Sequence, residues 1–169
     1  MKTNIIIFLS FLLFINCKED KVKTNLLGSI DIKVTGNTEA ANYFEKGLLL
    51  LHSFEYEDAR ESFLQAQETD SKMAMAYWGE AMTYNHTLWS DQDFEKGTAS
   101  LKKLEEFDYK KTSSNLELDF IKAVQILYQP ILEKKGRDLK YAQYMEQLSE
   151  KYPNNHEISA FYALSLLGS

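Results

Sequence analysis

The chain has 169 residues, of which 44% are hydrophobic and 26% are charged, a balance typical of globular proteins. Its 7 glycines, 2 prolines and single cysteine exclude a collagen-like chain, a low-complexity chain and a disulfide scaffold. The net charge of −6 argues against nucleic acid as a partner, because binding a phosphate backbone requires clustered Lys and Arg.

The first segment is an apolar run over residues 5–15, which only Ser10 interrupts. Such a run is too short to cross the ~30 Å hydrocarbon core, so we interpret residues 1–17 as a signal peptide. The only cysteine, Cys17, stands where this run ends. A cysteine at this place resembles that of a bacterial lipoprotein signal, in which the cysteine is lipidated and becomes the mature N-terminus. The resemblance implies a lipid anchor in the cell envelope, at the outer membrane, with the periplasmic or surface face left open. The alternative is a buried or free thiol.

Residues 18–38 are polar and contain Gly28 and Gly36, which is typical of a tether between an anchor and a folded domain. Their alternating apolar residues, Ile30, Ile32 and Val34, leave two other interpretations open. They form either one short strand or a peptide that lies along the first helices.

The remaining chain, residues 39–169, has apolar residues at intervals of three and four, which predicts an all-α domain. Ser114 with Glu117, and Asn154 with Glu157, have the spacing of capping boxes at helix starts. The predicted helices cover residues 39–53, 56–69, 72–86, 93–107, 115–129, 134–151 and 155–168.

Small and aromatic residues recur in this domain at fixed offsets. The first set is Gly47, Tyr56, Ala59, Phe63 and Ala66, and Gly79 follows Gly47 by 32 residues. These offsets resemble the tetratricopeptide repeat, over about residues 39–168. The resemblance implies helix pairs stacked as a right-handed solenoid of about three and a half repeats, acting as an interaction scaffold without catalytic residues.

The last predicted helix has an apolar face for which the sequence supplies no partner helix. The run MAMAYWGEAMTYNHTLW is also similar to one group of long bacterial tetratricopeptide-repeat proteins. We therefore expect this domain to be the N-terminal part of a longer array.

The first helices of successive repeats line a groove in this family, so the resemblance implies that a protein or peptide partner binds there. The expected groove residues are Phe44, Leu48, Leu51, Ala76, Glu80, Thr83 and Tyr84.

Two histidines, His52 and His86, each end the first helix of a predicted repeat. Stacked repeats would bring them together as a polar site beside Trp89, whereas the alternative has each bonded to a last carbonyl of its own helix. The chain around His86 and Trp89 is about eight residues longer than the repeat requires. We expect this loop to carry binding groups, or Trp89 to be a hydrophobic plug beneath it.

No nucleophile motif, phosphate loop or metal-ligand spacing is present in the sequence, so we expect a binding protein rather than an enzyme, with no cofactor or metal. An envelope enzyme or metal-binding protein that uses His52, His86 and Trp89 is the alternative. A structural spacer is a third possibility.

Overall fold

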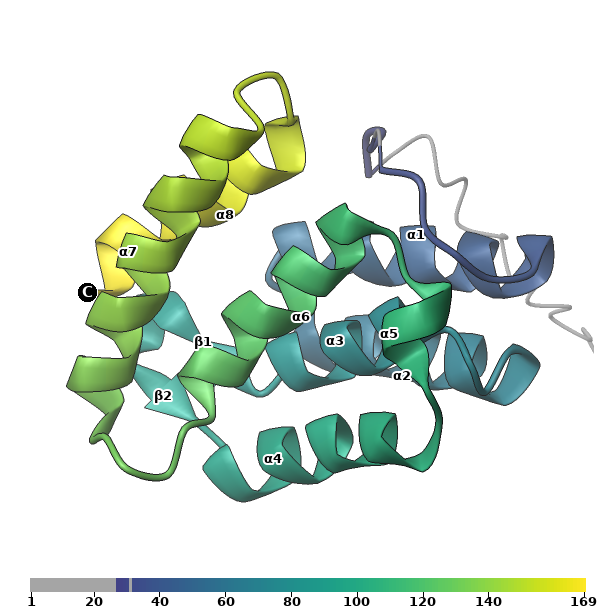
Figure 1. Ribbon diagram of the computed structural model, residues 1–169, viewed down its shortest axis with the longest axis horizontal. Helices are drawn as coiled ribbons and strands as arrows, with labels where there is room; N and C mark the ends of the chain where they lie inside the picture. The colour runs from purple at the N-terminus through teal and green to yellow at the C-terminus, as the bar shows by residue number, and fades with distance from the viewer. Residues whose placement is uncertain (1–26, 31) are drawn as a thin grey trace, which may run out of the picture.

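The computed structural model describes residues 27–30 and 32–169 (Figure 1). The predicted signal peptide and Cys17 lie outside the described residues. Within them the fold is all-α, as predicted, with two 3-10 turns and one two-stranded hairpin. The α-helices are α1 (Thr38–His52), α2 (Tyr56–Thr69), α3 (Ala74–Met82), α4 (Phe94–Lys102), α5 (Tyr109–Thr112), α6 (Asn115–Leu127), α7 (Lys134–Lys151) and α8 (His156–Gly168).

Polar side chains fix where two of the later helices begin. Ser114 and Glu117 form the predicted capping box at the start of α6. The cap of α8 is Asn155 instead of the predicted Asn154, because its side chain accepts a hydrogen bond from the N–H of Ile158 at 2.9 Å. The prediction of this cap was therefore wrong by one residue.

Two predicted helices are shorter in the structure. The helix predicted over residues 72–86 ends at the C-terminus of α3, where the Thr83 hydroxyl donates to the Glu80 carbonyl at 2.7 Å and the chain turns into the hairpin. The helix predicted over residues 93–107 divides into α4 and the 3-10 turn η3 (Lys103–Glu106).

The closest helix packing surrounds one ring, that of Phe63 in α2. A Cβ atom added at Gly47 of α1 would lie 2.8 Å from a carbon of this ring, and one added at Gly79 of α3 would lie closer still. Ala59 and Ala66, on the same helix as Phe63, are fully buried. Small residues at these positions therefore allow α1, α2 and α3 to approach closely.

A second aromatic group joins the early helices to the later ones. The ring of Trp78 in α3 lies 6.3 Å from that of Phe44, 5.4 Å from that of Phe120 and 5.4 Å from that of Phe161, measured between ring centroids. These residues belong to α1, α6 and α8, and all are almost fully buried. Figure 1 shows α6 between the early helices and the pair α7 and α8.

The segment before α1 lies against the helices. Its backbone runs beside α1 (Figure 1), and its apolar residues pack on the core. Two hydrogen bonds hold the end of this segment. Thr35 donates from its N–H and its hydroxyl to the Glu117 carboxylate at 2.6 and 2.8 Å. The described part of residues 18–38 therefore lies along the helices, as the peptide interpretation predicts, and forms no strand. The residues that pack are Leu27, Ile30, Ile32 and Val34.

The last helix is covered on one side and open on another. Phe161 is buried, whereas Leu166 and Leu167 are 54% and 72% exposed. The predicted lack of a covering helix therefore holds for the last turn of α8 but is wrong for Phe161. None of the described helices combines the length and apolar character needed to cross a membrane.

Candidate functional site

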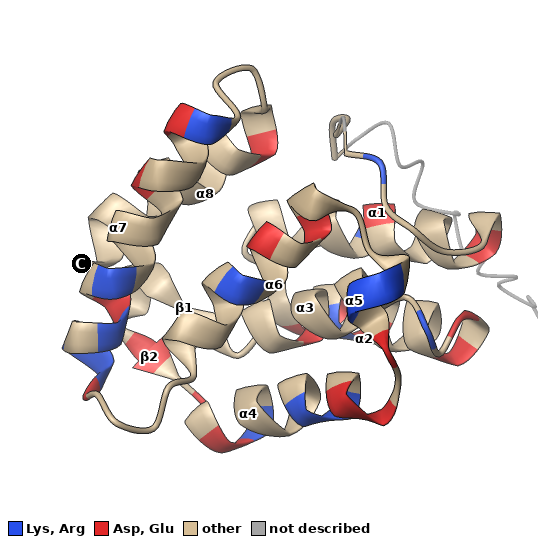
Figure 2. Ribbon diagram, in the orientation of Figure 1, with Lys and Arg blue, Asp and Glu red and all other residues tan. Residues whose placement is uncertain are grey.

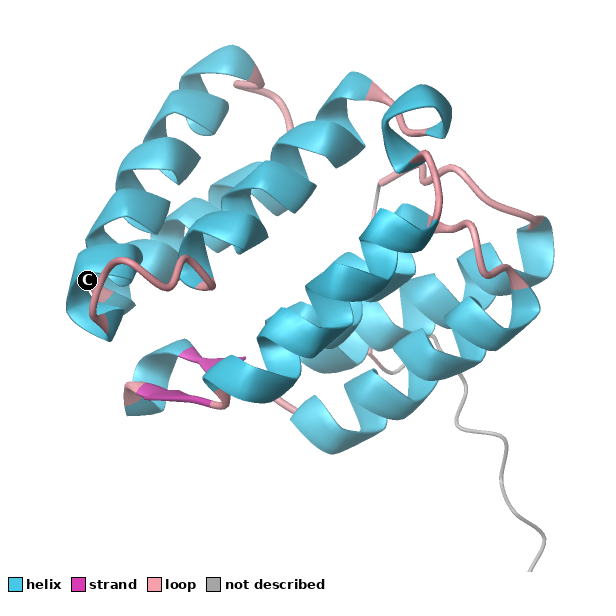
Figure 3. Cartoon of the chain, turned by 60° about the horizontal axis from the view of Figure 1, so that its bottom comes forward, coloured by secondary structure: helices cyan, strands magenta, loops and turns pink. Residues whose placement is uncertain are grey.

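The most distinctive local structure is the hairpin over residues 85–92. Its strands β1 (Asn85–His86) and β2 (Asp91–Gln92) are antiparallel and are joined by the 3-10 turn η2 (Thr87–Trp89). The N–H of Asp93 donates to the Tyr84 carbonyl at 2.9 Å and closes the base of the hairpin. The extra length that the sequence shows in this loop therefore forms an ordered projection, which Figure 3 shows in magenta at one end of the molecule.

Gln92 fixes the hairpin to the later helices. Its amide nitrogen donates to the Asn85 side chain at 3.0 Å and to the Leu127 carbonyl at 3.2 Å. Its amide oxygen accepts from the guanidinium of Arg137 at 2.7 Å, and Arg137 is itself buried on α7. Because both the nitrogen and the oxygen of this amide are hydrogen-bonded, Gln92 joins the hairpin to α6 and α7.

Four rings meet where the hairpin touches the turn between α1 and α2, and we call them the aromatic cluster: Phe54, Tyr56, His86 and Trp89. The Trp89 ring is nearly perpendicular to both Phe54 and Tyr56, at centroid distances of 5.8 and 6.1 Å. His86 stacks on Tyr56 at 4.1 Å. Trp89 is 61% exposed and Phe54 is 38% exposed, so the cluster faces solvent. The prediction that Trp89 is a buried plug is therefore wrong.

Two residues at this site have a left-handed backbone. Phe54 has φ 61° and Ser90 has φ 52°, and these are the only non-glycine residues with positive φ in the described chain. A left-handed conformation costs roughly 1–2 kcal/mol for a residue with a Cβ atom. At Phe54 it allows the N–H of Glu55 to reach the Leu50 carbonyl at 3.0 Å and so to end α1. The same turn directs the Phe54 ring toward Trp89.

The two predicted histidines have separate partners. His86 donates from Nε2 to the Thr83 carbonyl at the end of α3, at 3.1 Å, and its Nδ1 faces Asp91 at 3.1 Å. His52 binds Glu157 through Nε2 at 2.6 Å and so joins α1 to α8. His86 thus follows the alternative of a bond to a last carbonyl, and the predicted polar site shared by both histidines is not formed.

A small cavity of about 140 Å³ separates His52 from the aromatic cluster, and His52, Phe54 and Tyr56 all line it. The described part of the chain holds no group of three or more His, Cys, Asp or Glu residues that could bind a metal ion. The cavity is lined by Leu51, His52, Phe54, Tyr56, Met82, Asn85, Thr87, Ala160, Phe161 and Leu164.

The predicted groove is not open to a ligand. Six of its expected residues are at most 6% exposed, namely Phe44, Leu48, Leu51, Ala76, Glu80 and Thr83. The reason is that α6 and α8 pack Phe120 and Phe161 over α3. Within this interior the Glu80 carboxylate accepts from Gln67 and from Lys103. The seventh expected residue, Tyr84, is half-buried beneath the Arg60 guanidinium, 4.3 Å from its ring centroid.

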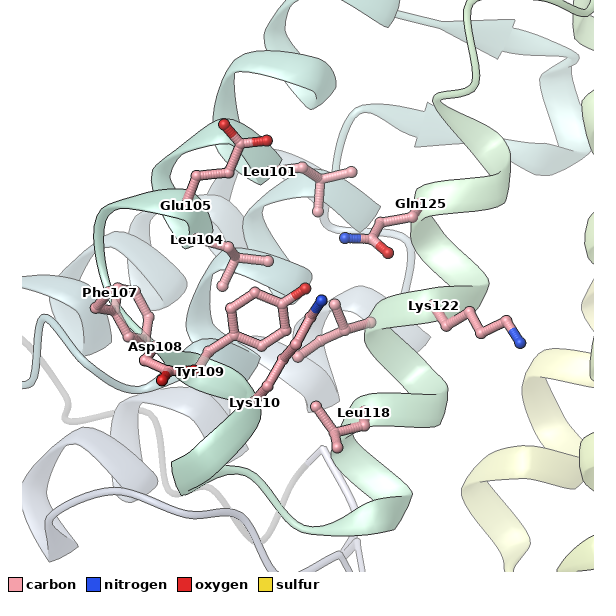
Figure 4. Close-up of a pocket in the computed structure, with 11 residues that line it drawn as sticks. Leu101, Leu104, Glu105, Phe107, Asp108, Tyr109, Lys110, Leu118, Lys122 and Gln125 are labelled. Atoms are coloured by element: carbon pink, nitrogen blue, oxygen red, sulfur yellow. The ribbon is translucent and has the colours of Figure 1, made fainter.

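A hollow that the sequence analysis does not identify lies between η3, α5 and α6, with a volume of about 710 Å³ (Figure 4). Leu104 and Ile121 form part of its buried floor. Its rim carries acids and bases together, Glu105 and Asp108 with Lys110 and Lys122, so its charge favours no class of ligand. Its lining residues come from the separate elements α4, η3, α5 and α6, so no short motif in the sequence identifies it.

The chain was compared with protein-family models, with curated proteins and with solved structures, and no match was found in any of the three.

Proposed function

We propose that this protein is a tetratricopeptide-like scaffold of the bacterial cell envelope that binds a protein or peptide partner. A lipid on Cys17 anchors it at the outer membrane. The repeat-like arrangement is supported by Gly47 and Gly79, which both lie against the ring of Phe63. In this proposal the partner contacts the aromatic cluster and the hairpin instead of the groove first expected.

The exposure of Trp89 is the observation that carries the proposal. Trp and Tyr are the residues most enriched among those that dominate binding energy at protein interfaces. A tryptophan that is 61% exposed, with its backbone held by an anchored hairpin, loses little conformational freedom when a partner covers it. Leu88 beside it is 43% exposed and extends the apolar surface. A rigid apolar projection of this kind is typical of an interaction site.

Site-specific photo-crosslinking in intact cells tests this proposal. A photoreactive amino acid at Leu88 is compared with the same amino acid at Leu139 of α7, because the two leucines are 43% and 44% exposed. We expect a discrete protein adduct from position 88 that is absent from position 139. Adding Trp89→Ala should remove most of it. Equal adducts at both positions, or none at position 88, would contradict a binding role for this surface.

A further inference from the structure

The charges around the aromatic cluster indicate which partner it fits. A hollow of about 360 Å³ beside the cluster is bordered by Phe54, Tyr56 and His86 and by residues at the start of α2 and immediately before it. Three of these are carboxylates, Glu55, Glu57 and Asp58, and all three are exposed. A fourth, Asp91, lies on β2 against His86, and Figure 2 shows its strand marked in red. The surface that borders the aromatic rings is therefore acidic.

Few cations compensate these acids within the described residues. No ion pair there involves Glu55, Glu57 or Asp58. The one guanidinium that borders the hollow belongs to Arg60, which already donates to Thr83 and covers the ring of Tyr84. A cation from outside would meet free carboxylates here, whereas a phosphate or an acidic peptide would be repelled.

The geometry of the rings suits the same kind of ligand. Trp89 is nearly perpendicular to Phe54 and Tyr56, at interplanar angles of 80° and 81°, so neither of these rings stacks flat on it. Its 61% exposure leaves aromatic surface on which a cation can lie. A Lys or Arg side chain over a Trp face is attracted by the electrons of the ring.

We propose that the aromatic cluster binds a lysine or arginine side chain in a basic segment of the partner, with its charged group over the Trp89 ring and attracted by Glu57 and Asp58. This inference rests on the proposed function and specifies the chemistry of the partner. The acids of α2 also favour the helix through its dipole, so a decisive test must separate the two roles.

The test uses the full-length protein and a displayed library of random peptides, followed by affinity measurements on one enriched peptide. Glu57→Gln removes a carboxylate at the second position of α2. Glu95→Gln is its matched control, because Glu95 is an exposed acid at the second position of α4 and does not border the hollow. Both variants lose the same favourable dipole interaction, but only the first changes the proposed site.

We expect the enriched peptides to contain Lys or Arg. Trp89→Ala should weaken their binding by roughly 2- to 30-fold, the range of a cation–π contact. Glu57→Gln should weaken it by roughly 1.5- to 5-fold, as for an exposed ion pair, and Glu95→Gln should leave it unchanged. Replacing the basic residues of the peptide by citrulline or acetyl-lysine should abolish the effect of Glu57→Gln.

Two results would overturn the inference. If peptides bind through Trp89 but are neutral or acidic, the partner is not basic and the proposed function still stands. If no peptide binds through Trp89 while crosslinking at position 88 still captures a protein, recognition does not use a basic segment. Failure of the crosslinking itself would instead contradict the proposed function.

Discussion

The contact between Gly79 and Phe63 offers a sharp test of the helix packing. In Gly79→Ala, the new methyl carbon would lie well inside van der Waals distance of the Phe63 ring. Gly47 of α1 faces the same carbons of the ring, at a distance that also excludes a Cβ atom, so the ring is closely packed by both helices. Phe63 is fully buried, so its ring cannot swing into solvent either.

The magnitude follows from two opposing effects. Overpacking a tight core costs roughly 1–3 kcal/mol. Alanine recovers roughly 1 kcal/mol through its higher helix propensity. At this contact we expect the cost to lie at the upper end of its range, so Gly79→Ala should lower the free energy of unfolding by about 1–2 kcal/mol.

Urea unfolding of the full-length protein measures this change, and Gly136→Ala is the control. A Cβ atom at Gly136 in α7 would meet only Leu132, at 3.6 Å or more, so this variant should gain about 0.5–1 kcal/mol. Phe63→Leu should partly rescue Gly79→Ala, because a smaller side chain relieves the overlap. If Gly79→Ala stabilises the protein as Gly136→Ala does, α1, α2 and α3 do not pack as described.

Three other predictions concern separate parts of the chain. Ala66→Leu should lower the free energy of unfolding by roughly 1–3 kcal/mol, since Ala66 is fully buried, and an unchanged midpoint in thermal unfolding would place it at the surface. Cys17→Ser should leave an unprocessed precursor that a fatty-acid analogue does not label, and labelling equal to that of the parent would exclude lipidation at Cys17. Burial raises the pKa of Asp119, but the hydrogen bonds from Lys151 and Tyr152 lower it more, so its pKa lies below the ordinary value of 3.8. The stability that Asp119 contributes is therefore complete above the unfolded-state pKa and is lost as the pH falls through the lower pKa of the folded state. Below about pH 5 the free energy of unfolding of the unmutated protein should fall, and in Asp119→Asn it should fall less steeply. Identical pH profiles of the two proteins would show that this carboxylate does not couple α6 to α7.

The fold class follows from the sequence because local rules determine most of it. Ser114 and Glu117 form their capping box within four consecutive residues, so the start of α6 needs no tertiary information. The close approach at Gly47 and Gly79 also appears in the sequence as small residues at repeat spacing. What the sequence could not show is that α6 and α8 fold over α3, because Phe120 and Phe161 are distant from Trp78 along the chain. That contact buries the groove on which the first hypothesis depended.

The candidate site was only partly predictable for the same reason. The extra length of the loop indicated His86 and Trp89 as residues of interest, and both belong to the aromatic cluster. Phe54 and Tyr56 reach it only because the turn between α1 and α2 lies beside the hairpin, a relation between segments more than thirty residues apart. For His52 the repeat register predicted the wrong partner. The sequence suggested a site shared with His86, but His52 binds Glu157, which lies 105 residues away along the chain.

The central claim is that a partner covers the aromatic cluster in the cell, and carbene footprinting tests it most directly. The modification of Trp89 is measured in the purified full-length protein and in intact cells, with Leu139 as the reference. The account predicts that Trp89, which is 61% exposed in the isolated chain, reacts severalfold less in cells while Leu139 reacts equally in both. Equal modification of Trp89 in the two samples would contradict it.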